Sequence, residues 1–200
     1  KIIRIENETA STKKFWIEIP ELERFDFVPG QFVTLDLPIH DQPNKRWRSY
    51  SIASAPDGTN VFELIIVLME GGLGTNYLFN EAVVGTSFPV RGPQGHFVLT
   101  DPIATDIFMV CTGTGIAPFM SIIRGVETYE HYSRVIVVWG TRIAKELAFK
   151  DLIESLNTDE IYSEVTEGKL RTYFTCTREP YENEGRVTTA MYEGKVQDRL

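Results

Sequence analysis

The sequence predicts a two-domain protein in which a small antiparallel β-barrel precedes a doubly wound α/β domain. Turn residues divide the first half into short β-rich runs, whereas the second half alternates apolar strands with amphipathic helices. The change comes just after residue 100, and a length of 200 residues suits two domains of about 100 residues each. We therefore expect one domain over residues 1–103 and a second over residues 104–200.

Six runs in the first half have the composition of strands, and pairs such as Pro29-Gly30 and Asp57-Gly58 separate them. The expected strands are 13–19, 31–37, 47–53, 61–68, 86–90 and 96–100. Several short strands at this spacing are typical of an antiparallel barrel. One short helix over residues 75–82 interrupts them.

The second half opens with an apolar run over residues 107–111, the kind of strand that is buried in a parallel sheet. Phe119, Ile122, Ile123 and Val126 then follow at helical spacing, which predicts one buried helix face. The pattern continues with a strand over 135–139, a helix with Phe149, Leu152, Ile153 and Leu156 on one face, a strand over 170–176 and a helix over 188–194. No closing strand follows, so either this domain lacks its final strand or the sequence stops before it.

Composition and charge argue against several classes of function. A formal net charge of −8 disfavours nucleic acid as a partner. No apolar run approaches the roughly 18 residues that span a bilayer, so we expect no membrane insertion. Cys111 and Cys176 are too few for a disulfide framework or an iron–sulfur cluster, and a cytoplasmic location is the default. The three histidines lack metal-ligand spacing, and no metal is expected.

The segment CTGTGIAP, residues 111–118, joins the first apolar strand of the second half to its helix. Gly113 and Gly115 allow a tight turn beside Thr112 and Thr114, and Pro118 suits the first helical turn. Free N–H groups at such a turn favour phosphate. The dinucleotide fingerprint is nevertheless incomplete, because Pro118 replaces its third glycine and Arg142 stands where an acid is expected. A plain strand–helix turn remains an open alternative.

A second glycine-rich turn, Gly72-Leu73-Gly74-Thr75, precedes the helix of the first half. Its N–H groups offer a further phosphate site, and Thr75 can cap the helix or donate its hydroxyl. An ordinary turn is the alternative.

The expected strand 47–53 carries polar and aromatic side chains together. Alternation places Arg48 and Tyr50 on one face and Ser51 on the other. Arg48 could hold a phosphate while Tyr50 stacks on a ring, although core packing also explains a tyrosine at this position.

Arginines follow the expected strand ends of the second half. Arg142, Arg178 and Arg186, with Thr177, lie where doubly wound sheets bind ligands, and several cations there could hold a 2′-phosphate. The alternative is a set of solvated loop arginines beside nearby glutamates.

Seven motifs in order resemble the ferredoxin–NADP reductase superfamily over essentially the whole chain. They are PGQFVTLDLP (29–38), RSYSIAS (48–54), GGLGTNYL (71–78), GPQGHF (92–97), CTGTGIAP (111–118), VVWGTR (137–142) and CTREP (176–180). The resemblance implies a flavin-binding barrel followed by an NAD(P)-binding domain. The family usually ends in a strand with a Cys-Gly-x-Pro motif, which has no counterpart here.

The resemblance also implies roles for individual residues. Arg48 would contact the flavin phosphates, Tyr50 would stack on the isoalloxazine, and Ser51 would hydrogen-bond near N5, which makes Tyr50 and Ser51 the candidate catalytic residues. The turn 72–75 would hold the pyrophosphate of FAD, and Thr112, Gly113, Thr114, Gly115 and Pro118 would form the nicotinamide-side cradle. Thr177, Arg178 and Arg186, with Arg142, would bind the 2′-phosphate and favour NADPH over NADH.

The function implied is hydride transfer from NAD(P)H to FAD, followed by electron transfer to a ferredoxin or flavodoxin. Such acceptors are usually acidic, so a basic patch of Lys45, Arg46 and Arg48 would have to face them. One alternative is an electron-transfer or regulatory flavin-binding subunit of a larger complex, such as an oxygenase or cytochrome reductase component. A siderophore-type reductase is less favoured, because GTGIAP and CTREP suit nicotinamide better.

Overall fold

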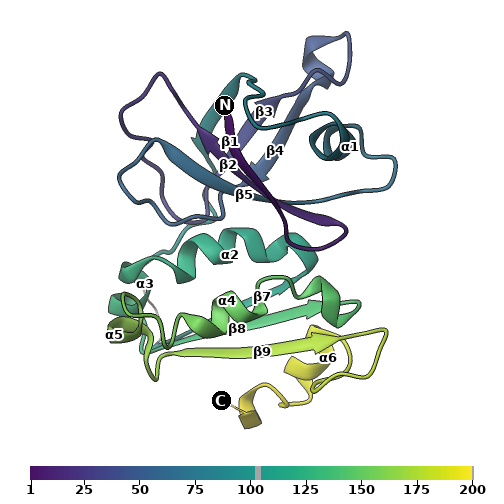
Figure 1. Ribbon diagram of the computed structural model, residues 1–200. Helices are drawn as coiled ribbons and strands as arrows, with labels where there is room; N and C mark the ends of the chain where they lie inside the picture. The colour runs from purple at the N-terminus through teal and green to yellow at the C-terminus, as the bar shows by residue number, and fades with distance from the viewer. Residues whose placement is uncertain (102–104, 200) are drawn as a thin grey trace.

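The computed structural model describes residues 1–101 and 105–199, and it contains two domains that pack against each other (Figure 1). The expected boundary between residues 103 and 104 lies outside the described residues. All strands before it are antiparallel, and all strands after it are parallel.

The first domain consists of two three-stranded sheets, ordered β1-β2-β5 and β4-β3-β6. Its strands are β1 (Ile2–Asn7), β2 (Thr12–Glu18), β3 (Phe32–Asp36), β4 (Trp47–Ser51), β5 (Val61–Val67) and β6 (Val90–Gln94). A bridge between Ile52 and Leu64 links the two sheets. Alternate side chains such as Phe15, Val33 and Leu64 are fully buried in one shared core. Strand pairing among the described residues thus gives two sheets that are linked at the Ile52–Leu64 bridge.

Three details of this domain differ from the sequence expectations. Strand β1 was not expected, because its exposed and buried residues do not alternate regularly. The expected strands 86–90 and 96–100 are replaced by a single strand, β6, which begins at the last residue of the first and ends before the second. Gly92 and Pro93 suggest a turn, yet they lie inside β6. An edge strand tolerates them because proline there need not donate a ladder hydrogen bond.

The second domain has a parallel sheet ordered β7-β8-β9, with helices on both faces. The strands are β7 (Asp106–Thr112), β8 (Arg134–Thr141) and β9 (Leu170–Cys176). The helices are α2 (Ile116–Ile123), α3 (Val126–His131), α4 (Lys150–Ser155), α5 (Ser163–Thr166) and α6 (Val187–Tyr192), and the first domain contributes α1 (Leu73–Asn80). Val137 and Trp139 face the core under α2 and α4, whereas Ile136 and Val138 pack under α6. None of the helices within the described residues is long and apolar enough to span a membrane.

The expected helix through Val126 is divided in two. α2 ends at Ile123, and Gly125 precedes α3, so that Val126 belongs to the next helix and is 47% exposed. Leu152 on α4 is likewise exposed, whereas Phe149, Ile153 and Leu156 are buried as expected.

Contacts made by α2 hold the two domains together. The buried Ser121 hydroxyl donates to the carbonyl of Ser54 at 2.6 Å. Beside it, Arg124 Nη1 lies 2.8 Å from Glu63 Oε2. Ile65 of β5 belongs to the same buried cluster as the apolar face of α2. The interface therefore has both polar and apolar contacts, which position the sites on either side of it.

We predict that Gly30→Ala destabilises the protein by about 3 kcal/mol or more. Gly30 has a φ of +99°, and a Cβ there would lie 1.9 Å from the carbonyl oxygen of Phe97. Gly58→Ala is the control, because Gly58 also has a positive φ (+79°) but open space around it. It should cost only about 1–2 kcal/mol of conformational strain. Chemical denaturation measures both, and equal losses would contradict the steric explanation.

Candidate functional site

Arg48 and Tyr50 of β4 lie beside the first turn of α1. A Cβ on Gly74 would come within 2.9 Å of Arg48 Cγ and 3.3 Å of the Tyr50 hydroxyl. This proximity confirms that Arg48 and Tyr50 share a face of the strand. Ser49 lies on the opposite face, where its hydroxyl is 3.0 Å from that of Thr34. Gly74 is buried, so only glycine lets α1 approach the strand this closely.

Backbone carbonyls orient the Arg48 guanidinium. Its Nη1 donates to the carbonyl of Lys45 at 2.9 Å and to that of Trp47 at 2.8 Å. The neighbouring Tyr50 is half-buried, and burial raises the pKa of its phenol to about 12 despite the opposing charge of Arg48. The phenol therefore stays neutral at physiological pH.

The N-terminus of α1 completes this site. Gly72 is the N-cap residue, and no side chain caps the helix. The Thr75 hydroxyl accepts a hydrogen bond from the N–H of Met69 and lies 3.1 Å from the carbonyl of Gly72, so it orders the turn. The first N–H groups of the helix thus remain available to an anion. The Arg48 side-chain stem, the Tyr50 hydroxyl and these N–H groups lie together at Gly74, a set that fits the phosphates and flat ring of FAD.

Ser51 is the last residue of β4, where it pairs with Phe32 and is half-buried. By alternation it lies on the face of β4 opposite Arg48 and Tyr50, so its approach to the same ligand stays a prediction.

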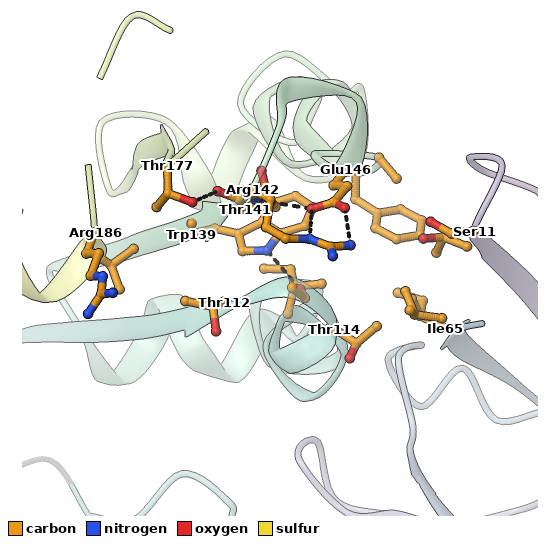
Figure 2. A pocket seen from close by; sticks show the side chains of 18 of the residues that line it. Ser11, Ile65, Thr112, Thr114, Trp139, Thr141, Arg142, Glu146, Thr177 and Arg186 are labelled. Atoms are coloured by element: carbon orange, nitrogen blue, oxygen red, sulfur yellow. Dashed lines mark hydrogen bonds and ion pairs between the residues drawn. The ribbon is translucent and has the colours of Figure 1, made fainter. Parts of the chain in front are cut away.

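A cavity of about 610 Å³ lies between the domains, at the carboxyl ends of β7 and β8 (Figure 2). Its size is typical of a small-molecule site. The second domain supplies most of its lining, including Thr112, Gly113, Thr114, Trp139, Arg142, Glu146, Thr177 and Arg186. The first domain supplies Ser11, Thr12, Ile65 and Val67.

The Gly113 backbone is exposed to this cavity. Gly113 has a φ of +52°, and a Cβ there would meet nothing within 4 Å. The indole Nε1 of the buried Trp139 donates to the Gly113 carbonyl at 2.9 Å and fixes the loop. Gly115 is the N-cap residue of α2, and Pro118 lies in its first turn, but neither lines the cavity. An open backbone that is held in place at this point fits the close approach of a dinucleotide.

The structure brings Arg142, Thr177 and Arg186 to this cavity but does not bring Arg178 there. Arg178 donates its backbone N–H to the carbonyl of Arg142 at 2.9 Å, and its side chain is exposed to solvent. Arg142 is ion-paired with Glu146 at 2.5 Å.

Three residues that line the cavity were not expected from the sequence as site residues: Ser11, Trp139 and Glu146. Trp139 lies in a buried strand, so its pattern predicts a core residue. The sequence around Ser11, in the β1–β2 turn, contains no motif that predicts a binding role.

We predict that Tyr50 lowers the stability of the protein at alkaline pH. Its pKa is raised from 10.0 to about 12 in the folded state, so between these values the unfolded chain binds fewer protons than the folded chain. Stability should therefore fall as pH rises above 10, and Tyr50→Phe should reduce that fall. Chemical denaturation at pH values from about 9 to 11, on either side of the ordinary tyrosine pKa, measures this loss of stability. Tyr192→Phe is the control, because Tyr192 is 93% exposed; equal pH profiles for the two variants would contradict the burial of Tyr50.

Comparison with known proteins agrees with this geometry. Residues 1–99 match the family of oxidoreductase FAD-binding domains, and residues 109–199 match the oxidoreductase NAD-binding domains. The chain is 33% identical to the flavodoxin/ferredoxin–NADP reductase of Rhodobacter capsulatus over 100% of this chain and 73% of that protein. It is 36% identical to the ferredoxin–NADP reductase of Azotobacter vinelandii, over 85% of this chain and 66% of that protein.

A solved structure has the same fold. The ferredoxin–NADP⁺ reductase of Neisseria gonorrhoeae, with bound FAD and NADP, superposes with a TM-score of 0.78 and 27% identity over 99% of this chain and 76% of that one. The matched regions span about two thirds of the length of several curated relatives. The two-domain architecture, the cofactor-binding domains and these similarities together show that the chain belongs to the ferredoxin–NADP reductase family.

Proposed function

We propose that the protein is a flavoprotein reductase that oxidises NAD(P)H and passes the electrons to a redox protein. The observation that carries this proposal is the contact between an FAD-binding domain and an NAD-binding domain in one chain, made by Ser121 and Ser54. When bound, the flavin would supply the redox chemistry, by taking a hydride from the nicotinamide and releasing electrons to the acceptor. The chain would supply binding, orientation and exclusion of water.

Each site residue has a proposed task. Arg48 and the turn Gly72-Leu73-Gly74-Thr75 neutralise the FAD phosphates, because the Arg48 side chain lies beside the uncapped N–H groups of α1. Tyr50 packs against the flavin ring, and Ser51 hydrogen-bonds to its edge. The turn 112–115, with Pro118 behind it, cradles the nicotinamide side of the dinucleotide.

The cations at the other end of the cavity favour NADPH. Arg186 and Thr177 bind the 2′-phosphate, and Arg142 lines the same cavity. Arg178 could reach the phosphate only by moving its exposed side chain. Charge-assisted hydrogen bonds to a phosphate are stronger than those to the 2′-hydroxyl of NADH.

The proposed acceptor is a ferredoxin or flavodoxin, as the names of the Azotobacter and Rhodobacter relatives suggest. Arg46 pairs with Asp36 at 2.5 Å, and Arg48 is assigned to the FAD phosphates, so Lys45 is the member of the expected basic patch that would face the acceptor. An oxygenase component is the alternative, since the chain is 30% identical to the glycine betaine monooxygenase reductase subunit of Pseudomonas aeruginosa over 42% of that protein. The closed barrel, the boundary between residues 103 and 104, and a cytoplasmic location also stay proposals.

We predict that the flavin-loaded protein loses its visible flavin absorbance faster with NADPH than with NADH, because Arg186 and Thr177 add contacts to the 2′-phosphate. Anaerobic stopped-flow mixing measures both rates. Equal rates would remove the NADPH preference. A flavin that neither dinucleotide reduces would contradict the proposed reductase and favour a flavin-binding subunit without turnover.

We further predict that Ser51→Ala slows flavin reduction about tenfold, the effect of one lost hydrogen bond of about 1.4 kcal/mol. Flavin affinity should change little, because Arg48 and the α1 turn hold the phosphates. Ser49→Ala is the matched control, since Ser49 lies on the same face of β4 as Ser51 but has its hydroxyl 3.0 Å from that of Thr34. An unchanged rate in Ser51→Ala would exclude Ser51 from this role.

A further inference from the structure

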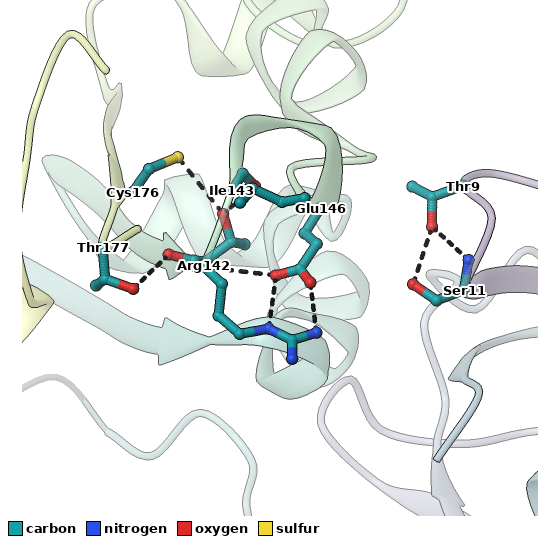
Figure 3. Close-up of polar contacts among 8 residues, drawn as sticks. Thr9, Ser11, Arg142, Ile143, Glu146, Cys176 and Thr177 are labelled. Atoms are coloured by element: carbon teal, nitrogen blue, oxygen red, sulfur yellow. Dashed lines mark hydrogen bonds and ion pairs between the residues drawn. The ribbon is translucent and has the colours of Figure 1, made fainter. Parts of the chain in front are cut away.

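Glu146 is a carboxylate inside the proposed 2′-phosphate cavity, where an anion would repel the ligand. It holds Arg142 by three contacts (Figure 3). Arg142 Nη2 lies 2.5 Å from Oε1, Nε lies 3.3 Å from Oε2, and the backbone N–H of Arg142 donates to Oε2 at 3.1 Å. The pair therefore cancels one of the cations expected to attract phosphate.

The Arg142 guanidinium also points away from the other phosphate-binding candidates. Figure 2 shows it beside Glu146 on the Ser11 side of the cavity, whereas Arg186 lies on the opposite side. Thr177 lies between them, with its hydroxyl directed to the carbonyl of Thr141 at 3.4 Å. Arg142 must therefore leave Glu146 before it can join Arg186 around one phosphate.

Glu146 is the more firmly held member of the pair. Its side chain is 20% exposed, against 60% for Arg142. Partial burial would raise the pKa of Glu146, but hydrogen bonds from the side chain and backbone of Arg142 outweigh it and lower that pKa. The carboxylate is thus ionised at neutral pH, and its bond to a backbone N–H keeps it in place when the arginine moves.

We propose that Glu146 is a specificity-determining residue that competes with the 2′-phosphate of NADPH for Arg142. This inference rests on the proposed function of the cavity. Exposed ion pairs contribute only about 0–1 kcal/mol, so a phosphate dianion that offers charge-assisted bonds can displace Glu146. NADH has no such group and leaves the pair intact. Glu146 thereby reduces the preference for NADPH below the value that the arginines alone would give.

The test compares the binding of 2′,5′-ADP, which carries the 2′-phosphate, with that of 5′-ADP, which does not. Glu146→Gln should bind 2′,5′-ADP about three- to tenfold more tightly, through the lost competition for Arg142, and should bind 5′-ADP as the original protein does. In an Arg142→Gln background, Glu146→Gln should give little of that gain in affinity, because the cation for which Glu146 and the 2′-phosphate compete is absent. Isothermal titration calorimetry of the four proteins measures this coupling.

Glu154→Gln is the matched control, because Glu154 forms the same i,i+4 kind of pair with Lys150 outside the cavity. It should not change either affinity. A full gain in the Arg142→Gln background would show general charge repulsion and overturn the competition. Unchanged or weaker binding by Glu146→Gln would also overturn it. These failures differ from failure of the proposed NADPH site, in which the original protein and Glu146→Gln would both bind 2′,5′-ADP no better than 5′-ADP.

Discussion

The hydrogen bond from the Ser121 hydroxyl to the carbonyl of Ser54 is the contact on which the placement of both sites depends. Ser54 follows the end of β4 by three residues, at most about 10 Å of extended chain. Ser121 follows Gly115 by six residues, about 9 Å along a helix. One buried contact therefore brings the Tyr50-Ser51 end of β4 and the glycine turn of the second domain toward the same interface.

Neighbouring groups orient two arginines of this acidic chain, but these groups have opposite effects on the charge that each arginine offers to a ligand. Carbonyls of Lys45 and Trp47 hold Arg48, so its full positive charge remains for a phosphate. A carboxylate holds Arg142, which cancels the charge while it fixes the geometry. Orientation reduces the entropy that binding must overcome in both cases. Only the first arrangement also leaves positive potential available to a phosphate.

Sequence patterns predicted the elements whose environment is local. The apolar strand 135–139 and the shared face of Arg48 and Tyr50 follow from residue spacing alone, and the structure contains both. Contacts between distant segments were not predictable in this way. Ser11 reaches the cavity from a turn in the other domain, and the close approach of Gly74 to β4 depends on packing that no periodicity encodes. The strand β6 was misplaced because its Gly-Pro pair has the composition of a turn.

The break between α2 and α3 shows why a local rule fails at an interface. Helical spacing predicts continuation to Val126, but the chain turns at Gly125, whose N–H donates to the carbonyl of Ile122. A Cβ on Gly125 would lie 3.8 Å from Pro29 of the first domain, so the backbone packs closely there. Arg124, at the end of α2, reaches Glu63 across the interface. The helix ends where the second domain meets the first, and the exposed Val126 follows from that domain contact, which the helical period does not contain.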